Sequence, residues 1–448
     1  MKADIKQLKL RTVKLIDIAL ITLLFAVTWI YYYTNVLENP FLWKGNVVMV
    51  GLFAFIFFFF AHTYDGFYIS YNTISETISE QVLGLFFADG VMLVVILILA
   101  RFRIQHLWPY ILMFFAQVLV IALWSYLSHI WYFKRFPAKD VAVIYDEREG
   151  METLISQYGF DKKFTITKTM HVKECLNDIT CLDNFETVFL SGIVSHDRNK
   201  ILKYCVRNNI DIFMVPRIGD VLMSGAHEVH MFHLPMMKVG RHHMSNEFRF
   251  LKRLFDFVSA SLLLILISPL MAITAIAIKA YDKGPVFYKQ TRLTRDGREF
   301  EVIKFRSMKV DAEKDGIARL STGENDDRIT PIGRFIRSCR IDELPQLINI
   351  IKGDMSVVGP RPERPEIAAQ YTEKMPEFDL RLQVKAGLTG YAQIYGKYNT
   401  TPYDKLQMDL MYISHMNPVE DLRIIFATVL VLFKKESTEG IDENKVTA

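Results

Sequence analysis

Residues 248–285 are FRFLKRLFDFVSASLLLILISPLMAITAIAIKAYDKGP, and their apolar part, 254–277, is long enough to span a bilayer. One interpretation is therefore a transmembrane helix. Basic residues flank both ends, however, and the positive-inside rule then places both flanks on one face of the membrane. Ser268-Pro269 stands in the middle, where proline breaks or kinks a helix. We therefore expect a re-entrant membrane helix over 249–281 that bends at this pair and returns.

Four apolar segments of spanning length precede this helix, at 13–33, 46–64, 83–100 and 108–133. With 51% hydrophobic residues, the chain is too apolar for a purely soluble protein. Heavily basic flanks before the first span and after the fourth place both ends of this four-helix transmembrane bundle in the cytoplasm. This orientation places Arg101 and Arg103 on the outer side of the membrane, which the positive-inside rule disfavours. The first span lacks a small-residue cleavage site, which favours a membrane helix over a cleaved signal peptide.

Between the bundle and the re-entrant helix, 137–240 has the pattern of a Rossmann-like α/β module. Its expected parallel strands are 141–145, 164–167, 187–192 and 210–216. No GxGxxG follows the first strand, which favours a structural or regulatory module over a dinucleotide-binding one. Five histidines follow, in HEVHMFH and RHHM, and lack carboxylate or cysteine partners at ligand spacing. They fit a linker better than a metal site, and the four irregularly spaced cysteines indicate neither zinc nor disulfides.

An acidic pair, Asp342-Glu343, lies in RIDELPQ just before an apolar helical run. We expect a helix to begin here with Asp342 at its N-cap, because Pro345 is tolerated in a first turn. Free N–H groups at such a helix start favour a phosphate. The structural alternative is that Asp342 only caps the helix and Glu343 only complements its dipole.

Cationic side chains surround this pair in the sequence. They are Arg328, Arg334, Arg337, Arg340, Arg361, Arg364, Lys304 and Arg306. Guanidinium groups bind phosphate oxygens in bidentate fashion, and the prolines on both sides of Arg361 restrict its backbone. Beside such a phosphate site, one carboxylate can attack phosphorus while the other binds Mg²⁺. The net charge of the chain is small, +4, and the Lys and Arg residues cluster beside apolar spans. This placement favours lipid head groups or phosphorylated substrates over nucleic acid as partners.

Several segments together resemble a known family, the bacterial polyprenyl-phosphate sugar-1-phosphate transferases, which are monotopic phosphoglycosyl transferases. In chain order they are KRLFDFVSASLLLILISPL, GPVFYKQTRLTRDGREFEVIKFRSM, DDRITPIGRFIR, RIDELPQLINIIKGDMSVVGPRPERPE, GLTGYAQIYGK and KLQMDLMYI. The resemblance covers about 249–435. By layout, 1–248 resembles the membrane bundle and Rossmann-like module of the family's long members.

The resemblance implies a mechanism for the acidic pair. Asp342 is implied to attack the β-phosphate of a UDP-sugar, release UMP and hold the sugar phosphate covalently until undecaprenyl phosphate takes it. Glu343 is implied to bind Mg²⁺. Phosphate-binding roles are implied for Arg361, Lys304 and Arg306, and Arg340 joins them as a neighbouring cation. Asp409 matches an acidic position of the family.

Two details concern the variety of enzyme. Thr294 stands where many relatives have glycine, which leaves the shape of that turn open. GPRPERPE and ESTEGID look like the corresponding segments of family members from exopolysaccharide operons, which favours glucose or galactose as the sugar.

One rival function is a membrane glycosyltransferase that releases UDP, although no DxD motif lies near the arginines. Another is a membrane scaffold in which the acidic pair is only a cap.

The expected protein is thus a multi-pass protein of the bacterial inner (cytoplasmic) membrane with its soluble domains in the cytoplasm. Its parts are a bundle (1–136), the α/β module (137–240), the re-entrant helix (249–281), a mainly helical catalytic domain (282–435) and a tail (436–448). We expect the last apolar segment, 422–435, to be an amphipathic helix on the membrane surface. A homodimer through the added domains is an expectation from the resemblance alone.

Overall fold

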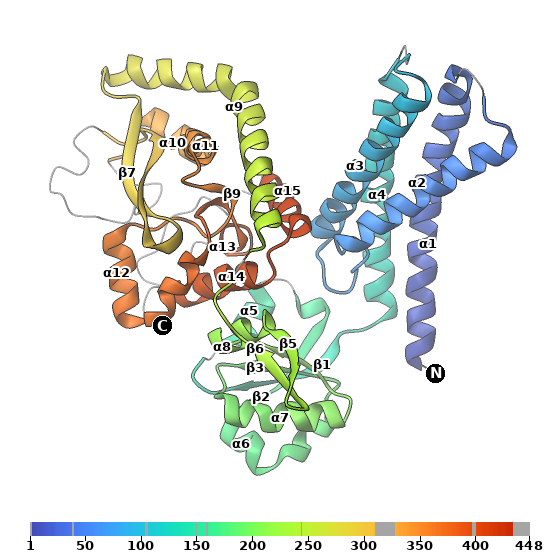
Figure 1. The fold of residues 1–448 in the computed structure, drawn as a ribbon. Coiled ribbons are helices and arrows are strands. Elements are labelled where there is room, and N and C mark those ends of the chain that lie inside the picture. Colours follow the sequence, from blue (N-terminus) through green and yellow to red (C-terminus); the bar gives the residue numbers. More distant parts are fainter. Residues whose placement is uncertain are drawn as a thin grey trace. The chain divides into compact units, whose positions relative to one another are not determined.

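The computed structural model describes residues 2–37, 40–103, 106–148, 150–157, 160–242, 244–309, 328–396 and 400–432 (Figure 1). Contacts divide the chain into two compact units, Met1–Val215 and Pro216–Ala448. The expected tail, 436–448, and the last residues of the expected surface helix, 433–435, lie outside the described residues.

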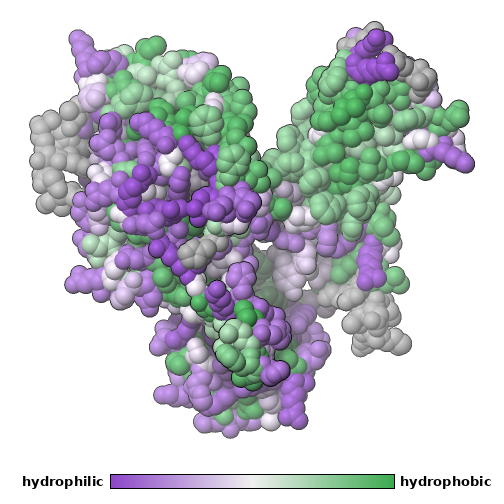
Figure 2. Space-filling view, in the orientation of Figure 1, coloured by the Kyte–Doolittle hydropathy of each residue, from purple (hydrophilic) through white to green (hydrophobic). Residues whose placement is uncertain are grey.

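The first unit begins with four helices of membrane length, as predicted. They are α1 (Lys2–Thr28), α2 (Trp43–Thr63), α3 (Ile74–Leu99) and α4 (Trp108–Arg135), and α1 continues as a π-helical turn over Trp29–Tyr33. The bundle core is aromatic, with the rings of Phe25 and Phe53 stacked at 4.2 Å between centroids. The outward side chains are apolar too, and Figure 2 shows hydrophobic residues gathered over these helices. Such a surface is suited to lipid.

The loop between α2 and α3 contacts the α/β module. The Tyr71 ring lies 6.0 Å from the Phe213 ring, and Lys163 Nζ lies 4.6 Å from the centroid of the Tyr71 ring. A soluble sheet and a loop that contacts it must lie on the same side of a membrane. The contact therefore places this loop on the same side as the sheet. That this side is the cytoplasm stays a prediction.

The α/β module contains the four predicted parallel strands. They are β1 (Lys139–Tyr145), β2 (Phe164–His171), β3 (Thr187–Ser191) and β4 (Asp211–Met214), in the order β2-β1-β3-β4. Helices α5 (Met151–Gln157), α6 (Val172–Asn177) and α7 (Ser195–Arg207) alternate with them. Four consecutive residues of β1 are buried, as expected of a strand covered on both faces. Free cysteines Cys175 and Cys205 pack in this core, where burial raises the pKa of Cys175 to about 12.

The second unit starts immediately after the sheet. Helix α8 (Ile218–Ser224) packs on α14 (Pro402–Ser414), where the Ser414 hydroxyl donates to the Val221 carbonyl at 3.2 Å. Gly225 lies so close that a Cβ there would come within 2.9 Å of Ser414 Cβ. The histidines of HEVHMFH, expected in a linker, lie in an antiparallel hairpin of β5 (His227–Met231) and β6 (Leu234–Lys238).

Helix α9 (Asn246–Asp282) is the apolar helix predicted from the sequence, and it has 37 residues. Ser245 caps it by accepting from the Phe248 N–H at 3.2 Å. Pro269 lies inside it, the Ser268 hydroxyl donates to the Ile265 carbonyl at 2.8 Å, and Figure 1 shows two arms joined at a sharp bend. Many of its apolar side chains are exposed, as Figure 2 shows. The bend fits a re-entrant path, which stays a prediction.

The rest of the second unit is mainly helical, as predicted. A hairpin of β7 (Phe287–Leu293) and β8 (Glu299–Phe305) is followed by α10 (Pro331–Ser338), α11 (Gln346–Lys352), α12 (Pro365–Lys374), α13 (Tyr391–Ile394), α14 and α15 (Pro418–Leu432). Two short strands, β9 (Ser356–Val358) and β10 (Gly387–Thr389), pair in parallel. Just after β9, Gly359 meets Gly387 backbone to backbone, since a Cβ on Gly387 would lie 2.1 Å from Gly359 N. This close approach fixes the start of the proline-rich loop.

Candidate active site

The acidic pair lies in a tight turn between two helices. Arg340 takes a left-handed conformation (φ 53°) after α10, and Ile341–Glu343 form a 3₁₀ turn. Helix α11 begins only at Gln346, with Pro345 at its N-cap position. The predicted N-cap role of Asp342 is therefore wrong, because the chain makes a separate turn before the helix starts. A left-handed non-glycine residue is uncommon, and such strain is often found at functional sites.

Three cations converge on Glu343, whose side chain is 13% exposed. Arg361 Nη2 lies 2.6 Å from Oε1, and Lys304 Nζ lies 3.4 Å from the same oxygen. Arg340 Nη1 lies 3.9 Å from Oε2. Three of the predicted phosphate-binding cations are thus gathered around one carboxylate, which neutralises part of their charge until an anion arrives.

Lys304 reaches Glu343 because strand β8 is pinned to α11. The buried Asn349 side chain accepts from the Ile303 N–H at 3.0 Å and donates to the Glu301 carbonyl at 2.7 Å. These two bonds replace the missing sheet partner at that edge and hold the end of β8 beside the turn. Lys304 follows in the strand and meets Glu343 at the distance given above.

The surroundings move the pKa values of the two carboxyls in opposite directions. Burial, followed by the adjacent Glu343 charge, raises the pKa of Asp342 to about 6. Burial would also raise the pKa of Glu343, but the charges of Arg361 and Lys304 hold it well below its usual range. Divergent pKa values in a carboxylate pair assign different roles to its members. At pH 7 Asp342 is mostly ionised yet more basic than an ordinary aspartate, which suits a nucleophile.

The pair can supply part of a magnesium site. Mg²⁺ is usually held by one or two carboxylates together with substrate phosphates and water. Adjacent carboxylates on Asp342 and Glu343 meet that requirement, and Glu343 Oε2 lies 3.9 Å from Arg340 Nη1, a long contact. Among the described residues there is no group of three or more metal-binding side chains. Substrate phosphates and water are suitable as the remaining ligands.

Arg306 lies elsewhere in the unit. It follows the end of β8, is 7% exposed, and forms an ion pair with Asp282 at the end of α9. No ion pair between Arg306 and the acidic pair is found among the described residues, whereas Lys304, two residues earlier, contacts Glu343. The phosphate-binding role expected for Arg306 stays a prediction.

Asp409 is buried on α14 and pairs with Arg381, whose Nη2 lies 2.7 Å from Asp409 Oδ2. Burial raises the pKa of Asp409 to about 6 although the Arg381 charge opposes this. Arg381 in turn donates to the Arg361 carbonyl at 2.8 Å. Asp409 therefore connects to the cation cluster through a backbone contact.

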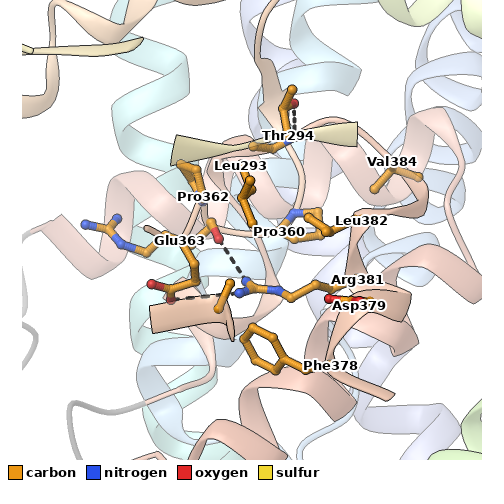
Figure 3. Close-up of a pocket in the computed structure, with 13 residues that line it drawn as sticks. Leu293, Thr294, Pro360, Pro362, Glu363, Phe378, Asp379, Arg381, Leu382 and Val384 are labelled. Atoms are coloured by element: carbon orange, nitrogen blue, oxygen red, sulfur yellow. Dashed lines mark hydrogen bonds and ion pairs between the residues drawn. The ribbon is translucent and has the colours of Figure 1, made fainter. Parts of the chain in front are cut away.

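A small pocket lies behind the proline-rich loop. Figure 3 shows Glu363 and Arg381 directed toward each other across it, among Leu293, Pro360 and Phe378. Arg292, Glu363 and Arg381 are not among the functional residues predicted from the sequence. Only Glu363 has a local signal, its place in GPRPERPE, because the loop carbonyls that the two arginines contact lie 70 and 20 residues away in the chain.

The turn at Thr294 has an ordinary backbone. Its φ is −126°, a conformation that does not require glycine. The buried hydroxyl donates to the Asp354 carbonyl at 2.9 Å and accepts from the Ala386 N–H at 3.2 Å. Threonine here ties the β7–β8 hairpin to the strands behind the site.

Comparison with known proteins agrees with the resemblance. A model of the bacterial sugar transferase family matches residues 247–435. The chain is 41% identical over 212 residues to UDP-glucose:undecaprenyl-phosphate glucose-1-phosphate transferase of Escherichia coli (strain K12), covering 46% of this chain and 44% of that protein. It is 30% identical over 316 residues to UDP-galactose-lipid carrier transferase of Erwinia amylovora, covering 66% of this chain and 63% of that protein.

A shorter relative is matched almost completely. The exopolysaccharide production protein PSS of Rhizobium leguminosarum bv. phaseoli is 40% identical over 189 residues, which cover 40% of this chain and 94% of that protein. The match therefore spans less than half of the Escherichia coli relative but nearly all of the Rhizobium one. The chain belongs to the bacterial sugar transferase family.

Proposed function

We propose that this protein transfers a sugar-1-phosphate from a UDP-sugar to undecaprenyl phosphate through a covalent intermediate on Asp342, releasing UMP. The observation that carries this proposal is the gathering of Lys304, Arg340 and Arg361 around the acidic pair. A diphosphate needs several fixed cations, and the pair supplies a basic carboxylate beside them. The names of the relatives add the nucleotide sugars and the lipid acceptor.

In the first step, a carboxylate oxygen of Asp342 attacks the β-phosphorus. The new O–P bond forms as the bond between that phosphorus and the bridging oxygen breaks, and UMP leaves with the bonding electrons. The products are UMP and a sugar phosphate joined to Asp342 as an acyl phosphate. The raised pKa of Asp342 makes it a better nucleophile than an ordinary aspartate while it is still ionised at pH 7.

In the second step, a phosphate oxygen of undecaprenyl phosphate attacks the same phosphorus. The bond to Asp342 breaks, the carboxylate is regenerated, and undecaprenyl diphosphate sugar is formed. Lys304, Arg340 and Arg361 bind the phosphoryl oxygens in both steps and offset the charge that gathers on them. No oxidant or reductant enters, and neither step needs a net proton transfer to the protein.

Magnesium is part of the proposal. Glu343, with Asp342 beside it, would hold the ion against the diphosphate, where it would supply charge neutralisation. Glu343 also forms ion pairs with the three cations that would bind the diphosphate.

The membrane elements bring the lipid phosphate to the same surface. We place the protein in the bacterial inner membrane, with α1–α4 spanning it and the α/β module and catalytic part in the cytoplasm. Helix α9 would enter one leaflet and return through its bend, and α15 would lie on the surface. Arg253 ties α9 to the catalytic part, donating to the Ile350 and Ile351 carbonyls at 2.6 and 2.7 Å.

The sugar proposed is glucose or galactose, and the product would start an exopolysaccharide, capsule or O-antigen unit. Relatives named for glucose and for galactose both match, and a third, from Rhizobium, is named for exopolysaccharide production.

The deciding experiment measures the nucleotide product. Purified protein in detergent or nanodiscs is given undecaprenyl phosphate, Mg²⁺ and each of a panel of UDP-sugars. We expect UMP with UDP-glucose or UDP-galactose. Release of UDP would identify a glycosyltransferase that transfers the sugar alone, and absence of nucleotide release with every sugar would support a scaffold.

A further inference from the structure

The loop that presents Arg361 is held from behind by its carbonyl groups. Three consecutive carbonyls each accept a hydrogen bond: that of Arg361 from Arg381 Nη2 at 2.8 Å, that of Pro362 from Arg292 Nη1 at 3.1 Å, and that of Glu363 from the Leu293 N–H at 2.9 Å. Two of the three donors are guanidinium groups from different parts of the chain. Because Pro360 and Pro362 have no N–H, the loop cannot be fixed through donors at these two positions.

Each guanidinium has its own anchor. Arg381 is paired with the buried Asp409 at 2.7 Å. Arg292 is held by Gln290, whose Oε1 accepts from Nε at 3.1 Å and from Nη2 at 2.7 Å. Glu363 lies 3.7 Å from Arg292 and 3.8 Å from Arg381 and balances their charge. Figure 3 shows its pairing with Arg381. The Arg292 side chain is 18% exposed and the Arg381 side chain 5%, so water competes little for these contacts.

The same loop carries the functional side chain of Arg361, which is 41% exposed and whose Nη2 lies 2.6 Å from Glu343 Oε1. The position of this guanidinium depends on the backbone that carries it. The placement of the Arg361 guanidinium therefore depends on the groups that hold the carbonyls behind it.

We propose that Arg292 and Arg381 are positioning residues that clamp the proline-rich loop and so hold Arg361 against Glu343 and the substrate phosphate. This inference rests on the proposed phosphoglycosyl transfer and names residues that act in it without touching substrate. Arg292 is the better probe of the pair, since Arg381 also buries Asp409 and its loss would leave that carboxylate unpaired.

The first test is the variant Arg292→Gln. We expect intermediate formation to slow by roughly 10- to 100-fold, the range that a displacement of about 1 Å can cause, with a smaller change in KM for the UDP-sugar. Arg298→Gln is the matched control, because Arg298 pairs with Asp354 at 3.0 Å, and in the described part of the chain its side chain has no hydrogen bond or ion pair with the loop. It should keep the wild-type rate. Arg292→Lys keeps the charge but cannot hold Gln290 and the Pro362 carbonyl together, so it should also be slowed.

A second readout separates positioning from general destabilisation. A displaced Arg361 guanidinium slows the attack at phosphorus, so Arg292→Gln should lower the single-turnover rate at saturating UDP-sugar much more than it raises KM. A merely unstable variant would lose amplitude in proportion to its unfolded fraction, and its folded fraction would keep the wild-type rate.

The third test is a double-mutant cycle with Arg361→Ala. If Arg292 acts through Arg361, adding Arg292→Gln to Arg361→Ala should slow the reaction by less than twofold further. Fully multiplicative effects, or a wild-type single-turnover rate in folded Arg292→Gln, would overturn the inference while leaving the proposed function intact. Should Arg292→Gln not fold, Arg292→Lys takes its place in the cycle and decides in the same way. If the wild-type protein releases no UMP from any UDP-sugar, both the proposed function and this inference fail.

Discussion

Arg361 Nη2 and Glu343 Oε1 lie 2.6 Å apart, although 18 residues separate them in the chain. This ion pair joins the proline-rich loop to the turn that carries the acidic pair. It holds the pKa of Glu343 low and leaves Asp342 as the more basic carboxylate of the pair. The difference between the two carboxyls is therefore a property of the folded loop and turn, and it can be tested residue by residue.

Asp342→Asn should abolish formation of the covalent sugar phosphate. The amide keeps the shape of the carboxylate but is not a nucleophile, so UMP release should fall by at least about 10³-fold. Asp342 caps no helix and its raised pKa shows that its charge is disfavoured, so the melting temperature should hardly change. Intact-protein mass spectrometry after mixing with UDP-sugar alone detects the adduct. An adduct in the Asn variant at the wild-type level would refute the assignment of the nucleophile.

The rate of intermediate formation should rise with pH through about 6 and level off above 7. Only the ionised Asp342 attacks phosphorus, and burial together with the Glu343 charge raises its pKa to about 6. Single-turnover release of UMP, measured between pH 5 and pH 8 at saturating UDP-sugar, gives this profile. A rate that is flat down to pH 5 would contradict the elevated pKa.

Glu343→Gln should move the same acid limb to lower pH. Removing the neighbouring negative charge lowers the pKa of Asp342, while Lys304 and Arg361 remain as cations near it. The maximal rate should fall, and the Mg²⁺ concentration for half-maximal rate should rise, because a proposed ligand is lost. Glu301→Gln is the control, since Glu301 forms an exposed ion pair with Lys289 and should behave like wild type. A limb that moves to higher pH would show that Glu343 does not act through its charge.

Pro269→Ala should impair transfer by changing the path of α9. Alanine restores the N–H donor and removes the ring clash, so the helix can straighten, and 37 straight residues extend about 55 Å. A cysteine introduced in place of Lys279, near the end of α9, should then change its labelling by a membrane-impermeant reagent applied from the cytoplasmic side. Leu270→Ala, at the next position, is the control. Unchanged labelling and activity in the proline variant would argue against a re-entrant path set by this residue.

Val221→Ala should destabilise the catalytic unit. Val221 is 3% exposed and belongs to the same hydrophobic core cluster as Leu406 and Leu410 of α14, so the lost methyl groups and the cavity cost about 1–2 kcal/mol of unfolding free energy. Hydrogen exchange should speed up in α14 more than in the α/β sheet. Met223→Ala on the same helix removes a half-exposed side chain and should have little effect. Equal effects of the two variants would show that α8 is not part of this core.

Much of the fold follows from local patterns. Apolar runs of spanning length predicted α1–α4, and alternating β-like and helical runs predicted the four parallel strands, because these signals depend only on composition and period. The helix break at Ser268-Pro269 belongs to this class, since proline lacks a donor wherever it occurs. Local reasoning failed at Asp342, where the left-handed Arg340 makes a turn of its own before α11.

The sequence alone determined that two carboxylates and many arginines exist in one region, but only the tertiary structure decided which of them meet. Lys304 reaches Glu343 across 39 residues and Arg292 reaches the Pro362 carbonyl across 70, whereas Arg306 pairs with Asp282. Such pairings depend on how the β7–β8 hairpin, the turn and the proline-rich loop pack together. Burial and neighbouring charge then set each pKa, and neither quantity exists in the chain until these segments are brought into contact.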